Sequence, residues 1–329
     1  MPLASINNIK RSTFDNSNVI TFTMDASRTN FSRYNKLTVL LGEETYEDKG
    51  QSLYVETRYF PLGISPQRAF ANMNLGSGPQ GQPQPKPVSS ESDSKLVSFF
   101  GRMNYAYDDR YLLTLSLRAD GSTKFAPDNR WGYFPSATVA WRVSREKFFE
   151  PISSTINDLK LRIGYGEAGN NRITDFQYLT TFSPSTQYDL LEQLITAYLP
   201  PNLANNALVW EESISRNIGL DMSFLQNRIQ FTADVYKNSS KNLLLNVAVP
   251  ASSGYTKQFQ NVGSLTNSGV EFQVNATALQ KKDFTWTINF NSSFNKDKIK
   301  SLGPDQTSFL ETSGWAGTNV PSDFIVKVG

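Results

Sequence analysis

The sequence lacks two residue types on which much enzyme chemistry depends. Its 329 residues contain no cysteine and no histidine. Disulfide frameworks, thiol nucleophiles, Cys/His zinc sites and Ser-His-Asp triads are therefore excluded. An excess of charge of either sign is missing too, since 32 Lys and Arg stand against 30 Asp and Glu. A balance this close gives no electrostatic footprint for nucleic acid. We therefore expect no nucleic-acid partner, and no metal or cofactor.

Long hydrophobic runs are absent as well. No stretch of about 18 apolar residues marks a transmembrane helix, and residues 1–20 lack the apolar core of a secretory signal peptide. At face value this start indicates a cytoplasmic protein. The alternative is an internal piece of a longer chain, and the last eight residues favour it because they end inside an apparent strand. Hydrophobic residues make up 39% of the chain, yet aromatic residues reach 12%. This mixture is typical of a protein with one face in water and one in lipid.

The dominant pattern in the sequence is alternation with a period of two. Apolar and polar residues alternate in eight segments: residues 37–41, 113–118, 137–143, 159–165, 217–224, 229–235, 270–278 and 284–291. Each segment predicts a β-strand with one dry face and one wet face. Alternation alone is equally compatible with a soluble antiparallel sandwich, whose dry faces would point inward.

Strand length and loop length favour a membrane barrel over the sandwich. Residues 214–225 and 269–279 form longer segments than ordinary strands, and a strand that crosses a bilayer needs about 9–11 residues. Short connections at 108–109, 226–228 and 280–283 alternate with long ones at about 47–95, 120–134, 166–209 and 241–267. Outer-membrane barrels have short periplasmic turns and long extracellular loops. Aromatic residues gather near strand ends, as in an interfacial girdle: Tyr105, Tyr107, Tyr111, Phe148 and Phe149.

A set of motifs in fixed order carries a family resemblance from about Asn35 onward. The motifs are LVSFFGRMNYAYDDRYLLTLSLRADGS at 96–122, RWGYFPSA at 130–137, LKLRIGYG at 159–166, GNN at 169–171, WEE at 210–212, NIGLD at 217–221, NVGSL at 261–265, NSGVE at 267–271 and FTW at 284–286. In this order they resemble the barrel region of the SusC/RagA family of TonB-dependent outer-membrane transporters.

The resemblance implies an all-β fold, an antiparallel transmembrane β-barrel of about 22 strands. About half of it, ten or eleven segments, would lie within residues 1–329. The signal peptide, TonB box, plug domain and C-terminal strands would lie outside. It also implies import of oligosaccharides or oligopeptides across the bacterial outer membrane, in contact with lipid. The implied partners are a SusD-like surface lipoprotein and the TonB–ExbB–ExbD complex, reached through the missing N-terminal part. A passive porin and a soluble glycan-binding sandwich are the alternatives.

Parity along the strands predicts which residues line the lumen. The charged ones, expected to satisfy one another by ion pairs, are Arg118, Arg142, Lys160, Arg162, Asp221, Asp234 and Glu271. Gly164 and Gly219 share this parity, where close packing requires space. Arg216 is the one charge on the dry parity, near the loop end of its strand.

Candidate ligand contacts come from aromatic residues in the long loops: Trp131, Tyr178, Tyr188 and Tyr198. No catalytic constellation is evident. The adjacent carboxylates Glu211 and Glu212 would face opposite sides of a strand, and Asp108 and Asp109 suit a tight turn. We therefore expect a transport protein and not an enzyme.

Overall fold

The computed structural model describes residues 2–24, 34–191, 193–255, 257–303, 306–311 and 324–329, and β-strands dominate it. The strands are β1 (Leu3–Met24), β2 (Asn35–Arg58), β3 (Val88–Tyr107), β4 (Tyr111–Ser122), β5 (Trp131–Arg142), β6 (Ile156–Asn170), β7 (Ser183–Leu190), β8 (Gln193–Leu199), β9 (Glu211–Phe224), β10 (Ile229–Lys241), β11 (Leu244–Ala248), β12 (Lys257–Asn261), β13 (Ser264–Lys281), β14 (Phe284–Ser301), β15 (Ser308–Glu311) and β16 (Phe324–Lys327). The helical segments among the described residues are α1 (Pro66–Ala71) and 3₁₀ turns at Met73–Leu75, Pro127–Asn129, Val143–Arg145, Lys147–Ile152 and Ala251–Ser253. Within these residues, no helix has the length and apolar character that spanning a membrane requires.

The first of two compact units comprises Met1–Ser17 and Glu44–Val97. Neighbouring parts of β1, β2 and β3 pair in it, and polar side chains join the strands. The Arg11 guanidinium, for example, makes two hydrogen bonds of 2.8 and 2.7 Å to the Asp48 carboxylate. At one end, α1 begins at the N-cap Ser65. A small apolar cluster packs there: Ala4, Phe60, Ile64, Ala69 and Met73.

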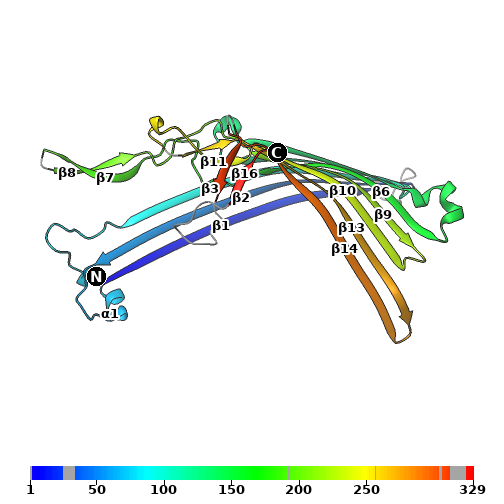
Figure 1. Ribbon diagram of the computed structural model, residues 1–329, viewed down its shortest axis with the longest axis horizontal. Coiled ribbons are helices and arrows are strands. Elements are labelled where there is room, and N and C mark those ends of the chain that lie inside the picture. Colours follow the sequence, from blue (N-terminus) through cyan, green and yellow to red (C-terminus); the bar gives the residue numbers. More distant parts are fainter. Residues whose placement is uncertain (1, 25–33, 192, 256, 304–305, 312–323) are drawn as a thin grey trace. The chain divides into compact units, whose positions relative to one another are not determined.

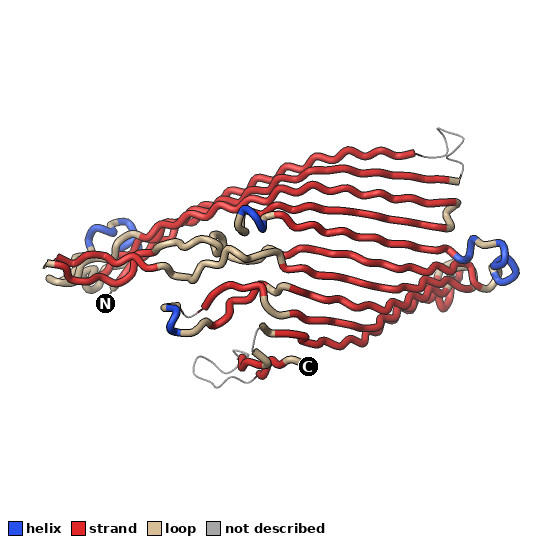
Figure 2. Tube along the Cα trace, turned by 90° about the horizontal axis from the view of Figure 1, so that it is seen from above, coloured by secondary structure: helices blue, strands red, loops and turns tan. Residues whose placement is uncertain are grey.

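The second unit comprises Asn18–Glu43 and Ser98–Gly329 and holds most of one sheet. The strand order is β1-β2-β3-β4-β5-β6-β9-β10-β13-β14, so strands follow one another in space as in the sequence. Pairs of described register are antiparallel, and Figure 2 shows the strands side by side. In the described part of the chain, the hairpins β7–β8 and β11–β12 and the two-stranded sheet β15–β16 lie outside this order (Figure 1). A single meandering sheet of ten strands contradicts the sandwich, which needs two packed sheets.

The predicted short turns are confirmed, with backbone geometry that explains their residues. Asp108 and Asp109 both have φ of 52°, the left-handed conformation at both central positions that a two-residue hairpin favours. The Arg110 amide closes the turn on the Tyr107 carbonyl at 2.9 Å. Lys36 Nζ lies 2.8 Å from Asp109 Oδ1. This hydrogen bond holds the pKa of the Asp109 carboxyl below its usual value.

The predicted loop boundaries are too wide, because strand ladders continue into polar sequence. For the loop predicted at 47–95, β2 runs on to Arg58 and β3 already begins at Val88. The loops predicted at 120–134, 166–209 and 241–267 are likewise shortened by strand ends at 122, 131, 170 and 264, and the last two contain the hairpins β7–β8 and β11–β12. The strand β1 was not predicted, because its polar residues do not alternate cleanly with apolar ones. Hydrogen bonding to β2 stabilises β1 as a strand, although its sequence does not alternate between apolar and polar residues.

Candidate functional site

One face of the sheet is apolar along a register that crosses seven strands. The paired residues are Leu113, Val139, Ile163, Ile218, Val235, Val270 and Phe294. Paired residues project from the same side of a sheet, so these side chains form one continuous surface, called here the apolar face. Five of them are solvent-exposed in the isolated chain, Ile218 at 60% and Phe294 at 67%, and Leu113 and Val270 are half-buried. An exposed apolar surface of this extent is what a lipid-facing wall requires.

Aromatic side chains lie near both ends of the apolar face. Tyr107 and Tyr111 stack with ring centroids 6.4 Å apart beside the 108–109 turn. At the loop end of β4 and β5, Phe99 and Trp131 stack at 6.2 Å. The Tyr111 hydroxyl donates a 2.7 Å hydrogen bond to Glu146. This places aromatic rings where a barrel carries its interfacial girdles.

The opposite face carries an ion-pair network and is called here the polar face. Asp221 accepts from Lys160 Nζ at 2.8 Å and from Arg162 Nε at 2.9 Å. The same Arg162 reaches Asp234 on the next strand at 3.1 Å. On β4 itself, the Arg118 guanidinium lies 2.7 Å from an Asp120 carboxylate oxygen. The prediction that lumen-parity charges satisfy one another is thus confirmed for these residues.

Arg142 and Glu271 complete the predicted charged set. Arg142 lies 3.6 Å from Asp158. Glu271 is paired in register with Asp234, and it makes no ion pair with any residue that the structure describes. Two carboxylates thus lie side by side with only one of them neutralised by Arg162, which leaves this part of the polar face acidic.

The glycines of the polar face leave room for the network. A Cβ at Gly219 would lie 2.6 Å from the Arg162 guanidinium carbon, and one at Gly164 would overlap the Asn217 amide. Any side chain at Gly219 would push Arg162 away from its carboxylates. The predicted need for space at both positions is confirmed.

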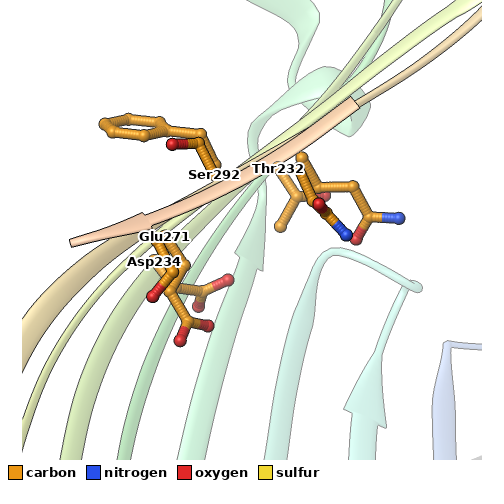
Figure 3. Close-up of a pocket in the computed structure, with 8 residues that line it drawn as sticks. Thr232, Asp234, Glu271 and Ser292 are labelled. Carbon is orange, nitrogen blue, oxygen red and sulfur yellow. The ribbon is translucent and has the colours of Figure 1, made fainter. Parts of the chain in front are cut away.

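Two shallow hollows lie beside the network, one on the polar face and one lined by side chains of both faces. One is lined by side-chain amides, hydroxyls and two carboxylates: Ser215, Asn217, Asp234, Tyr236, Asn238, Asn267 and Glu271. We call it the amide groove. The second shares Asp234 and Glu271 with it and adds Thr232 and Ser292 among its lining. Figure 3 shows the Asp234 and Glu271 carboxylates projecting to one side of the sheet and Ser292 to the other. Such a surface offers hydrogen bonds to neutral polar ligands.

A buried aromatic cluster fixes the loops above the sheet. Trp210 packs against Phe125 at 5.3 Å and edge-on against Phe134 at 5.5 Å. The Trp210 indole donates a 2.8 Å hydrogen bond to the Arg130 carbonyl. Leu208 and Phe125 are fully buried. We call this cluster, with the hydrogen bonds described next, the loop platform.

Side-chain amides tie three loops into the loop platform. Asn261 binds the backbone of Val209 through both its amide atoms, each at 2.8 Å. Asn205 donates to the Phe259 carbonyl at 2.9 Å. Glu211 accepts from Asn170 and from the Leu244 backbone amide, each at 3.1 Å. Trp210 and Glu211 belong to the quoted WEE motif, Asn170 to GNN and Asn261 to NVGSL. Loop anchoring therefore accounts for part of the family-like sequence.

The four aromatic ligand candidates are not brought together. Trp131 begins β5 and stacks on Phe99 next to the apolar face, while half-buried Tyr178 lies in a turn before β7. Tyr188 and Tyr198 belong to the hairpin β7–β8 and are 49% and 64% exposed. The hairpin positions are open to a ligand. Ligand contact by any of the four stays a prediction.

Sequence reasoning missed the amide groove, and at the loop end of the apolar face it found Arg216 but not the lysines near it. The groove needs residues from β9, β10 and β13 in register, which alternation within one strand does not supply. Two of these lysines, Lys237 and Lys296, lie beyond the predicted strand ends at 235 and 291. No group of three or more potential metal ligands occurs in the described part of the chain.

Comparison with known proteins assigns the family. The family described as "TonB dependent receptor-like, beta-barrel" matches residues 4–322, so the similarity extends well before Asn35. The TonB-dependent receptor SusC of Bacteroides thetaiotaomicron is 39% identical over 224 residues, 67% of this chain and 22% of SusC. TonB-dependent receptor P3 of Formosa agariphila is 31% identical over 290 residues, 86% of this chain and 28% of that protein. The chain therefore spans between a fifth and a third of these relatives.

Solved structures agree on the fold. A structure titled "Structure of the RagAB peptide transporter" superposes with a TM-score of 0.82 at 23% identity, covering 99% of this chain and 33% of the other. The outer membrane transporter YddB of Escherichia coli gives 0.57 at 10% identity, covering 97% of this chain and 38% of YddB. The open ten-stranded sheet, its apolar and polar faces and these matches lead to one assignment: the chain belongs to the TonB-dependent receptor β-barrel family of outer-membrane proteins, similar to SusC and RagA.

Proposed function

We propose that this chain forms part of the wall of a TonB-dependent transporter that imports a large polar nutrient across the bacterial outer membrane. The observation that carries the proposal is the contrast between the two faces of the sheet. The apolar face suits lipid, and the polar face suits a water-filled lumen. Because most charges of the polar face are already paired, the wall is hydrated without holding a ligand by strong net charge.

The substrate class that fits the polar face is an oligosaccharide or an oligopeptide. The amide groove presents donors and acceptors at close intervals. Hydroxyl groups recur along an oligosaccharide, and peptide N–H and C=O groups recur along an oligopeptide. The exposed Tyr188 and Tyr198 on the hairpin β7–β8 add flat surfaces for stacking. One solved relative is titled a peptide transporter, which supports the peptide, and the family resemblance carried by the sequence motifs implies either class.

The proposed partners follow from the family. A SusD-like surface lipoprotein would deliver the ligand from outside, and the TonB–ExbB–ExbD complex would supply energy through a plug. The loop platform supports this arrangement because it holds three extracellular loops in fixed positions. A rigid loop surface is a suitable base for a partner protein.

The test is uptake by cells that carry the full-length gene product. Deleting the gene should abolish growth on a glycan or a peptide mixture as the only carbon or nitrogen source. Deleting tonB should do the same, whereas a passive porin would keep working without TonB. Copurification from membranes should recover a surface lipoprotein. Growth on both substrates without the gene would refute the proposal.

Variants in the amide groove connect this function to the described residues. Asn217→Ala with Glu271→Gln should slow uptake while the protein still reaches the outer membrane. Asn275→Ala is the matched control, because Asn275 lies on the same face of β13 but outside the groove. Equal uptake by the groove variant and the control would contradict a role for the groove.

A further inference from the structure

Basic side chains lie at the loop end of the apolar face on three strands. The paired register that contains them reads Tyr165, Arg216, Lys237, Ser268 and Lys296. On β14, Lys298 is the next residue on the same side. The basic row is defined here as Arg216, Lys237, Lys296 and Lys298. All four side chains are exposed.

The basic row borders the paired apolar residues, and on β9 the buried Ile214 lies beyond it on the same side. One register nearer the short turns, the same face carries Ile163, Ile218, Val235, Val270 and Phe294. Successive residues on one face of a strand are about 7 Å apart. The change from apolar to basic thus takes one step on β9, β10 and β14 alike. In a barrel this step, on the long-loop side, is where lipid tails give way to head groups of the outer leaflet.

The positive charges of the basic row are not neutralised by carboxylates of the described residues. Arg216 is directly opposite Lys237, and like charges in opposite positions of a ladder are unfavourable. No member of the row makes an ion pair with any residue that the structure describes. Two acids share this face nearby. Glu167 accepts a hydrogen bond from the Tyr165 hydroxyl. Glu212 lies opposite Lys241, which is not a member of the row.

Arg216 is held in place by an aromatic ring. Its guanidinium carbon lies 5.6 Å from the centroid of Tyr165, a cation–π contact that leaves the guanidinium edge free to donate. The lysines beside it are point charges with three donors each. Together they offer donors for phosphate oxygens, the anions for which Arg and Lys are both suited.

We propose that the basic row binds the phosphate groups of the phosphorylated glycolipid of the outer leaflet, the lipid A part of lipopolysaccharide. The charge complementarity and the position directly beside the lipid-facing residues select this occupant. Lipid tails would lie against the apolar register, and phosphates against the row. The proposal rests on the membrane placement of the proposed function but not on its substrate.

The test uses the full-length gene product in nanodiscs of phosphatidylcholine. The probes are lipid A with its phosphates, lipid A treated with phosphatase, and phosphatidylglycerol, and retained lipid is counted by native mass spectrometry. The variant is Lys237→Gln with Lys296→Gln. The control is Lys281→Gln with Lys282→Gln, two exposed lysines at the opposite, short-turn end of β13.

Wild type and control should retain phosphorylated lipid A, and the Lys237→Gln, Lys296→Gln variant should bind it about 30-fold more weakly, since each basic residue near an anionic surface contributes roughly fivefold. Lys237→Arg with Lys296→Arg should restore binding. Equal retention of phosphatase-treated lipid A by the wild type would overturn the proposal without needing any variant. Equal retention of phosphatidylglycerol, or an equal loss in the control, would overturn it too. Uptake is measured separately, so failed transport with intact lipid A binding would count against the proposed function alone.

Discussion

The loop platform makes a sharp prediction about one glycine. A Cβ added at Gly169 would overlap the tip of the Phe134 ring at Cζ. That ring is 6% exposed and is held edge-on against Trp210. It has little room to turn away, because Gly132 is also packed directly against it. We expect Gly169→Ala to force the ring out of its site and loosen the anchoring of the loops.

The magnitude follows from the packing. Overpacking a filled site costs about 1–3 kcal/mol, and complete loss of a buried Phe side chain, about 3–5 kcal/mol, is the upper bound. Gly166→Ala is the matched control on the same strand, since its new Cβ would meet only the Ser136 Cβ at an ordinary 3.4 Å. Both changes remove similar freedom from the unfolded chain. The difference between them therefore isolates the clash.

The assay is urea unfolding of the full-length gene product in detergent, followed by tryptophan fluorescence. Gly169→Ala should lower the free energy of unfolding by about 1–3 kcal/mol relative to Gly166→Ala. In a cycle with Phe134→Ala, the double variant should lose less than the sum of the single losses, because no ring is left to clash. Equal stability of the two alanine variants, or strict additivity in the cycle, would refute the packing argument.

Two further predictions concern the faces and turns of the sheet. Leu115→Arg, on the apolar face between the aromatic ends, should impair barrel assembly by about 2–4 kcal/mol, while Ser116→Arg on the polar face should be tolerated; equal yields of heat-modifiable barrel on gels would contradict the assigned faces. Asp109→Asn should remove a small stabilisation, at most about 1 kcal/mol. Because its pKa is lowered in the folded protein by Lys36, this stabilisation is present above the ordinary aspartate pKa of about 3.9 and is lost as pH falls below it. The stability gap between wild type and Asp109→Asn, measured from pH 7 to pH 3, should therefore close; a gap that widens at low pH would show the opposite linkage.

The sequence predicts the sheet well because alternation is a local signal. The parity of Leu115, of Arg162 and of Gly219 each follows from immediate neighbours, and the structure confirms all three. The Asp108-Asp109 turn was also predictable, since aspartate tolerates the left-handed backbone that the hairpin needs. Where the pattern of one strand carries the information, no knowledge of its partners is required.

What sequence reasoning missed depends on contacts between distant segments. The pairing of Asn261 with Val209 joins residues 52 positions apart, and no local pattern announces it. The lysines of the basic row were not predicted for a different reason. The predicted strands ended where alternation stopped, but Lys237 and Lys296 continue the ladder beyond it. Backbone hydrogen bonds extend a strand regardless of what its side chains face.

The loop platform separates the part of the loops that must stay constant from the part that is free to vary. Trp210, Phe134 and Asn261 hold the bases of the loops, whereas the hairpin β7–β8 forms a small sheet of its own. The hairpin β11–β12 belongs to the anchored part, because Asn261 is its last residue. A change at a hairpin tip therefore leaves the anchoring contacts intact. Such a wall keeps its loop bases fixed while the hairpin tip varies in sequence. The hairpin β7–β8 is therefore the part of these loops that can be replaced while the sheet and its apolar face stay unchanged.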